Sequence, residues 1–257
     1  RTQDLTDRQS RGLEQVFEEE IFPVLSPVAV TGVEDFPLLS NQSLNILVQL
    51  APEAKSQRPR FAVIGLRRSS TRFITLHVEG GYGYTLIEDV IRLYVERFFP
   101  GETVVETVPF RLTRNADLSV RDDSAADLMS EMEEILDARK QSACVRLELA
   151  AGASETALAF LKQVLNVHND DVFSTPGPLD LSAFMQLTDL PGFDNLKYEA
   201  WPPQPSPQVD QRKSIFDVIT QQDVLLFHPY DSFEPVLRLV ESAADDPDVL
   251  AIKMTLY

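Results

Sequence analysis

The chain has 257 residues, of which 44% are hydrophobic, and its 40 acidic and 23 basic residues give a formal net charge of −17. This composition predicts a globular protein that can bury one large or two modest cores. The acidic balance argues against nucleic-acid binding through overall charge, because like charges repel over distances set by the Debye length. No apolar run approaches the roughly 18 residues of a membrane span, so we expect no transmembrane segment.

The N-terminus and the cysteine usage indicate the compartment. The opening stretch RTQDLTDRQSRGLEQ has no apolar core of the kind that signal peptides carry. Cys144 is the single cysteine, so no internal disulfide can form, which suits a reducing cytosol. Its place in the alternating stretch ACVRLELA predicts a buried structural thiol rather than a reactive one. We therefore expect a cytoplasmic protein.

The first part of the chain has the mixed patterns of an α+β domain. Residues 5–20 have the spacing of one amphipathic helix that stops before Pro23. Short segments rich in β-branched residues predict three strands of one antiparallel sheet, at 44–50, 60–66 and 72–78. Later segments predict helices at 86–99, 124–140 and 154–166, and a strand at 143–150.

A basic island interrupts the acidic chain. It holds basic residues and no acidic ones, namely Lys55, Arg58, Arg60, Arg67, Arg68 and Arg72. This pattern is typical of the solvated face and tip of a β-hairpin. An anion-binding surface is the alternative.

A domain boundary is expected at the proline-rich stretch AWPPQPSPQVDQRKS, because proline breaks both helices and sheet ladders. Beyond it, apolar runs at 223–228 and 249–257 flank an amphipathic helix at 233–244. This order predicts one βαβ unit of a parallel sheet, with Asp231 or Ser232 capping the helix. One such unit cannot cover its own sheet, so we expect an incomplete α/β domain.

The carboxyl ends of the two expected strands are candidate binding positions, because ligands of parallel sheets bind there. At the first end, Tyr230, Asp231 and Ser232 adjoin a helix N-terminus that suits a phosphate; an ordinary capped turn is the alternative. At the second, Lys253 would need an anionic partner if it were buried.

Other common sites have little support. The glycine cluster at 80–83 lacks the lysine and the spacing of a phosphate-binding loop and predicts a turn. His77, His168 and His228 are far apart, and none has a second ligand at metal-binding spacing. We therefore expect no metal site made by protein groups alone.

Several motifs in register resemble one family. The stretch DVLLFHPYDSFEPVLRLVESAADDPDVLAIKMTLY resembles the start of the first catalytic domain of bacterial polyphosphate kinases of the phospholipase-D-like type. Upstream, IFPVLSPVAV, FPLLSNQSLN, LIEDVI, FRLTRNADLSV and GPLDLSAFMQL resemble the head domain of that family, in the same order. The resemblance implies an internal fragment: the last helix of an N-terminal helical domain (1–20), the head domain (21–205) and a truncated, phospholipase-D-like start of the first catalytic domain (206–257).

The resemblance also implies an activity. Members of the family transfer the terminal phosphate of ATP reversibly to inorganic polyphosphate through a phosphohistidine, and they use Mg²⁺. We also expect a homo-oligomer. Peripheral membrane association of the full enzyme is left open. The phosphorylated histidine would lie beyond Tyr257, so we expect no catalytic residue in this chain, and His228 should not be mistaken for the nucleophile.

By the same resemblance, four residues are candidates for the substrate or phosphate cleft: Tyr230, Asp231, Ser232 and Lys253. Arg111 and Arg114 are weaker candidates. For these two arginines the alternative is a structural network with Asn115 and Asp117, since guanidinium groups commonly tie turns together.

Two other functions stay open at this point. Residues 20–205 could form a non-catalytic assembly module that mediates dimer contacts. A phospholipase-D-like hydrolase would share the catalytic fold, but it has no reason to contain the head-domain motifs and should show paired HxK motifs.

Overall fold

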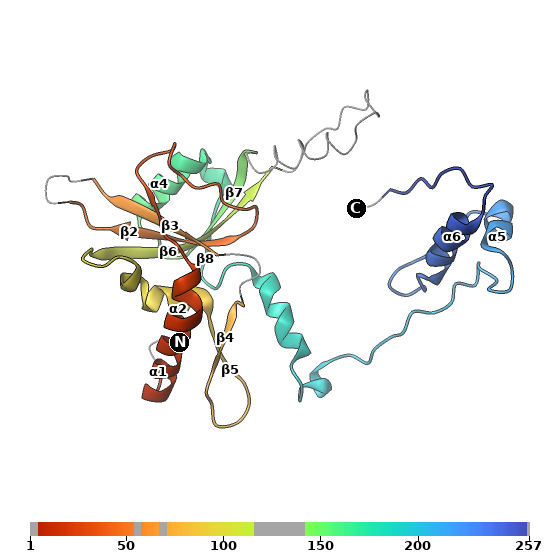
Figure 1. The fold of residues 1–257 in the computed structure, drawn as a ribbon, viewed down its shortest axis with the longest axis horizontal. Helices are drawn as coiled ribbons and strands as arrows, with labels where there is room; N and C mark the ends of the chain where they lie inside the picture. Colours follow the sequence, from red (N-terminus) through yellow and green to blue (C-terminus); the bar gives the residue numbers. More distant parts are fainter. Residues whose placement is uncertain (1–4, 54–57, 67–70, 116–141, 256–257) are drawn as a thin grey trace. The chain divides into compact units, whose positions relative to one another are not determined.

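The computed structural model describes residues 5–53, 58–66, 71–115 and 142–255. The chain divides into two compact units, Arg1–Thr188 and Asp189–Tyr257 (Figure 1). The predicted helix at 124–140 lies outside the described residues. Within the described residues, no helix is both long enough and apolar enough to cross a lipid bilayer.

A six-stranded sheet forms the centre of the first unit, in the order β1-β3-β2-β6-β7-β8. All neighbouring pairs are antiparallel except β7 and β8, which are parallel. The strands are β1 (Val28–Val30), β2 (Leu44–Leu50), β3 (Arg60–Gly65), β6 (Val104–Arg114), β7 (Cys144–Ala150) and β8 (Val172–Thr175). The predictions of β2, β3 and β7 are thus confirmed.

The third predicted strand belongs elsewhere. β4 (Phe73–Leu76) pairs with β5 (Gly83–Leu86) in a separate two-stranded sheet, so its expected place beside β3 is wrong. The local turn explains this pairing. Gly80 and Gly81 have φ angles of 89° and 74°, values that glycine adopts at little cost, and they fold β5 straight back onto β4.

Two predicted helices of the first unit change type along their length, and the first runs past its predicted end before Pro23. The N-terminal helix consists of α1 (Asp7–Val16), a π-helical turn (Phe17–Ile21) and a 3₁₀ turn (Phe22–Val24). The predicted helix at 86–99 becomes α2 (Ile87–Leu93) and a 3₁₀ helix (Val95–Phe98).

Helix α4 (Glu155–Leu165) begins after Ser154, whose side chain caps it, and ends at Asn166 in the left-handed conformation. Short 3₁₀ helices follow at Asn169–Asp171 and Leu181–Asp189, and a further one at Asp194–Leu196 lies in the second unit.

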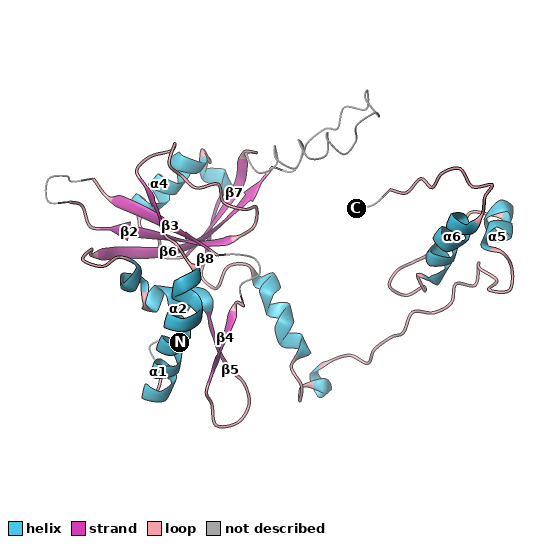
Figure 2. Ribbon diagram, in the orientation of Figure 1, coloured by secondary structure: helices cyan, strands magenta, loops and turns pink. Residues whose placement is uncertain are grey.

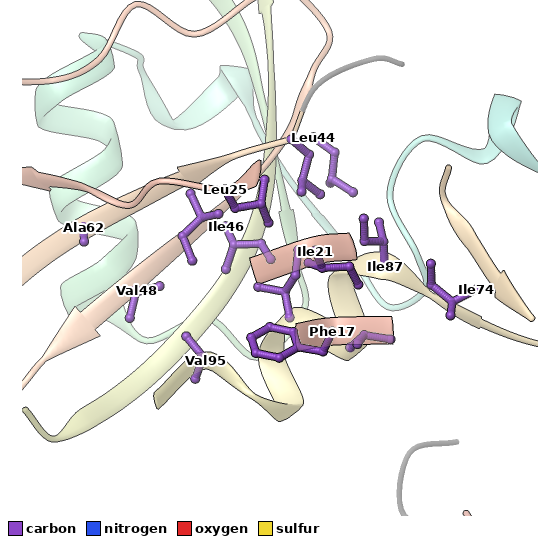
Figure 3. Packing of buried hydrophobic residues seen from close by; sticks show 14 of the residues in the cluster. Phe17, Ile21, Leu25, Leu44, Ile46, Val48, Ala62, Ile74, Ile87 and Val95 are labelled. Atoms are coloured by element: carbon purple, nitrogen blue, oxygen red, sulfur yellow. The ribbon is translucent and has the colours of Figure 1, made fainter. Parts of the chain in front are cut away.

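Two hydrophobic clusters cover the two faces of the six-stranded sheet. Ile46 and Val48 of β2 face one cluster, which contains residues of α1, the π-helical turn and α2 (Figure 3). Leu47 faces the other cluster, which contains the apolar residues of α4. This alternation follows from the two-residue period of a strand. Because both faces are covered, β2 reads as a nearly continuous apolar run.

The second unit contains α5 (Ile215–Gln221) and α6 (Glu234–Asp245). The helix predicted at 233–244 is therefore confirmed. Its flanking strands are not formed: the described residues 223–227 and 249–255 have no strand assignment and appear as loop in Figure 2. A parallel strand obtains its hydrogen bonds from neighbouring strands, and no such neighbour is present among the described residues of this unit.

Candidate functional site

The turn before α6 holds three of the predicted cleft residues. Asp231 closes it twice: its Oδ2 accepts a hydrogen bond from the Phe227 N–H at 2.8 Å, and its own N–H donates to the Phe227 carbonyl at 2.8 Å. The His228–Pro229 bond is cis, and His228 Nδ1 lies 3.0 Å from the Asp231 carbonyl oxygen. The Asp231 carboxylate thus has a structural partner already.

The proline-rich linker pairs with this turn inside the second unit. Gln204 donates its N–H to the Tyr230 carbonyl at 2.7 Å and accepts the Ser232 N–H at 2.8 Å. Ser232 Oγ accepts the Glu234 N–H at 3.2 Å, in the first turn of α6. The N-cap position of α6 is Phe233, which has no side-chain cap, so the prediction of Asp231 or Ser232 as the cap is wrong, although Ser232 still binds the N–H of the first helical residue.

Tyr230 and Lys253 present their side chains to solvent. Tyr230 is 53% exposed and stacks on Phe227, with ring centroids 5.4 Å apart. Lys253 lies in the exposed stretch after α6 and makes no ion pair with a described residue. The structure thus brings together Tyr230, Asp231 and Ser232 in one turn and does not join Lys253 to them. Because Lys253 is exposed, it needs no anionic partner.

Arg114 ties together the segments at the end of β6. Its guanidinium donates to the Leu39 carbonyl at 3.3 Å and to the Ser142 carbonyl at 2.8 Å. Its backbone N–H donates to Asn41 Oδ1 at 2.8 Å. This is a structural network of the expected kind, although its described partners are Leu39, Asn41 and Ser142; Asp117 lies outside the described residues.

Arg111 lines a cleft of about 350 Å³ in the first unit. Its Nε donates to the Gln42 carbonyl at 3.1 Å, and its Nη1 lies 3.3 Å from Glu148 Oε2. Its Nη2 lies 3.6 Å from Asp180 Oδ1, and Asp180 also lines the cleft. Arg111 therefore joins two carboxylates from distant parts of the chain.

Arg72 also lines this cleft, and with Glu88 it forms a buried ion pair that was not predicted from the sequence. Arg72 and Glu88 have side chains only 9% and 5% exposed, and Arg72 Nε lies 3.2 and 3.3 Å from the two carboxylate oxygens of Glu88. The available signal was the apolar setting of Glu88 in LIEDVI, where Ile87, Val90 and Ile91 are all buried. A charge within such a run predicts a buried partner.

The basic island does not form one cationic surface among its described residues. Arg72 is paired with Glu88, and Arg60 forms ion pairs with Glu102 and Glu53. The hydrogen bond from Arg60 lowers the pKa of Glu102. Arg60 begins β3, as the hairpin interpretation expects. The anion-binding alternative is weakened, because these arginines already have carboxylate partners.

Cys144 is buried, as predicted, at the start of β7. Its thiol lies 3.3 Å from the Arg146 carbonyl oxygen, and burial raises the pKa of the thiol. A protonated, buried thiol is a poor nucleophile. The described residues also include no group of three His, Cys, Asp or Glu side chains that could hold a metal ion.

These features define an α/β unit joined to a smaller second unit, without a recognisable catalytic group among the described residues. The sequence-family model named polyphosphate kinase middle domain matches residues 8–187, and the family model named polyphosphate kinase C-terminal domain 1 matches residues 214–257. The chain therefore belongs to the polyphosphate kinase family.

Curated relatives and a solved structure agree with this assignment. The polyphosphate kinases of Halalkalibacterium halodurans and Bacillus cereus are each 41% identical, over 258 and 261 residues, which is 99% of this chain and 37% of either relative. The chain thus spans somewhat more than a third of their length. The crystal structure of polyphosphate kinase from Porphyromonas gingivalis has the same fold, with a TM-score of 0.65 over 95% of this chain and 35% of that one, at 21% identity.

Proposed function

We propose that this chain is the head domain and the opening of the first catalytic domain of an enzyme that reversibly transfers the terminal phosphate of ATP to inorganic polyphosphate. The observation that carries the proposal is the order of the two family matches, with the middle domain first and C-terminal domain 1 after it. Alignments with proteins named polyphosphate kinase, which cover 99% of the chain, support it. We keep a cytoplasmic location in the proposal, because the single cysteine suits a reducing compartment.

The proposed reaction proceeds through a phosphohistidine whose nucleophile lies outside this chain. A histidine nucleophile needs a neutral imidazole with an accessible ring nitrogen, and phosphoryl transfer needs cationic groups around the transferring phosphate. We place His228 outside this chemistry because the resemblance puts the phosphorylated histidine beyond Tyr257; in the structure its Nδ1 lies 3.0 Å from the Asp231 carbonyl oxygen and its ring packs on Phe233, which fits a structural role in the turn. Residues of this chain would help to position the reacting groups and would not themselves form or break the phosphate bonds.

Mg²⁺ has no site of its own among the described residues, since no acidic cluster there could hold it. In the proposed reaction the ion would accompany ATP and offset phosphate charge. The turn with Tyr230, Asp231 and Ser232 would form part of the cleft rim, where the exposed side chain of Tyr230 could reach a ligand.

The proposal extends to the fold of the second unit. Residues 223–228 and 249–257 would become parallel strands of a phospholipase-D-like sheet once neighbouring strands of the complete protein hydrogen-bond to them. Their exposed apolar side chains support this, because Leu225 and Leu250 are 79% and 97% exposed, and such residues usually become covered by a packed partner. Homo-oligomerisation stays a prediction.

The direct test is polyphosphate synthesis. The complete protein and this chain alone are each incubated with ATP labelled at the γ position and Mg²⁺, and long-chain polyphosphate is measured. We expect synthesis by the complete protein and none by the chain. A complete protein that makes no polyphosphate but cleaves phosphodiesters would overturn the proposal in favour of the hydrolase.

A further inference from the structure

The segment that follows β8 is the last part of the first unit. It begins at Pro176, continues through Leu179 and Asp180 into the 3₁₀ helix Leu181–Asp189, and the second unit starts at Asp189. Whatever holds the start of this segment determines where the chain leaves the first unit. Leu179 and Asp180 make the contacts at the start of the segment.

The buried Arg72–Glu88 pair holds both of these residues by their backbone. Arg72 donates from Nη2 to the Leu179 carbonyl and from Nη1 to the Asp180 carbonyl, the latter at 2.8 Å. Glu88 fixes the guanidinium from the other side through Nε and Nη2. A guanidinium whose donors are used in two directions at once imposes a definite geometry on both partners.

Side chains of the segment add a second set of contacts. The Asp180 carboxylate lies 3.6 Å from Arg72 Nη1 and 3.6 Å from Arg111 Nη2, and it accepts the Ser182 hydroxyl at 2.6 Å. Leu179 is buried in the core cluster that contains α2. Phe184 packs edge-on against Phe73, with ring centroids 5.2 Å apart.

The charges of this network argue against a binding site for a free anion. The network contains as many arginines as carboxylates, which are Arg72, Arg111 and Arg146 with Glu88, Glu148 and Asp180. No cationic excess is left to attract a phosphate, and the carboxylate of Asp180 already lies between two guanidinium groups. The arrangement suits the holding of a peptide segment instead.

We propose that Arg72, Glu88 and Asp180 form a positioning device that fixes the start of segment 179–186 against α2 and β6 and so sets where the chain leaves the first unit. This proposal does not depend on the proposed kinase activity. Applied to that activity, it rests on the proposed function and predicts that polyphosphate synthesis needs segment 179–186 to be held in place.

Two variants separate geometry from charge. Asp180→Asn removes the carboxylate charge, and asparagine tolerates the observed φ of 52°. Arg72→Lys keeps the charge beside Glu88, but an ammonium group cannot reproduce the planar fork that reaches both carbonyls. Glu102→Gln is the matched control, because it removes an arginine partner, that of Arg60, outside this network.

Hydrogen exchange of the 257-residue chain, followed by mass spectrometry, measures directly how firmly residues 179–188 are held. We expect peptides from 179–188 to exchange about tenfold faster in both variants, the loss expected for one charged hydrogen bond, while peptides from β2 and β3 stay protected. Glu102→Gln should change neither. Unchanged exchange in 179–188, or equal acceleration of all peptides, would overturn the positioning role.

The complete kinase supplies the second readout. We expect Asp180→Asn to lower kcat for polyphosphate synthesis and to leave KM for ATP unchanged. An unchanged kcat would refute the need for a held segment 179–186 in synthesis. An inactive wild-type protein with the expected exchange pattern would instead refute the proposed function and leave the positioning device standing.

Discussion

Replacing Glu88 by glutamine tests whether the buried ion pair stabilises the first unit. The substitution keeps the size of the side chain and removes the charge that faces Arg72, whose side chain is only 9% exposed. Removing one partner of a buried pair costs about 3–5 kcal/mol, because the other charge is left uncompensated. Asp180 Oδ2 lies 3.6 Å from Arg72 Nη1 and offsets part of this loss. We therefore expect Glu88→Gln to lower the free energy of unfolding by about 3 kcal/mol.

A double-mutant cycle with Arg72→Met isolates the interaction between the two residues. The double variant Arg72→Met, Glu88→Gln removes the buried charge but leaves the carbonyls of Leu179 and Asp180 without their donor, which costs about 1–3 kcal/mol for each unsatisfied group. We expect the double variant to be less destabilised than the sum of the single variants, with a coupling energy of about 2 kcal/mol.

Urea unfolding followed by far-UV circular dichroism suits this cycle. The one tryptophan, Trp201, lies in the second unit, so its fluorescence monitors the unit that the substitutions do not touch. The two signals together separate the transitions of the two units. A loss below about 1 kcal/mol for Glu88→Gln, or strict additivity in the cycle, would refute the reasoning.

Three further predictions concern single residues of the first unit. Phe17 is fully buried and contacts the rings of Phe22, Tyr94 and Phe98, so Phe17→Ala should lower the unfolding free energy by about 3–5 kcal/mol in urea titrations, and a loss near zero would contradict the packing. Ser154→Ala should cost about 1 kcal/mol in the same assay, because the hydroxyl caps α4. Burial raises the pKa of Cys144, so iodoacetamide should alkylate the thiol slowly in the folded chain and rapidly in urea. The folded state holds this proton more tightly than the unfolded state, and the thiol contribution to stability should therefore decline as the pH rises above the ordinary thiol pKa; rapid alkylation of the folded chain would contradict this account.

The fold was predictable where burial leaves a simple pattern. β2 and β3 read as apolar runs because helices cover both faces of the sheet, and α4 has a serine cap and a clear apolar face. β6 escaped prediction although it is central in the sheet. Its sequence VVETVPFRLTR mixes charges with apolar residues and contains Pro109, a residue that argues against a central strand because it lacks an N–H.

Strand pairing is not encoded in the pattern of a single strand. Residues 72–78 show the composition of a strand, but only the turn at Gly80 and Gly81 determines that β4 pairs with β5 rather than with β3. In the second unit, residues 223–228 have the composition of a buried strand, and the hydrogen-bonding partners that such a strand needs are not among the described residues.

The candidate site was predictable only in part. The sequence pointed to Tyr230, Asp231 and Ser232 because a turn and a helix follow one another there, and the structure does bring them together in one turn. Whether they face a substrate stays a prediction. The Arg72–Glu88 pair was missed because its partners are 16 residues apart, and its backbone acceptors more than 100 residues further on, so that no local pattern connects them.

The most direct test of the account is the location of the phosphorylated residue. The chain alone and the complete protein, as wild type and as His228→Ala, are incubated with ATP labelled at the γ position, and acid-labile phosphate bound to protein is measured. The account predicts label on the complete protein with or without His228 and none on the chain. Label on the chain, or its loss from the complete protein when a folded His228→Ala variant is used, would contradict the claim that the nucleophile lies outside these residues.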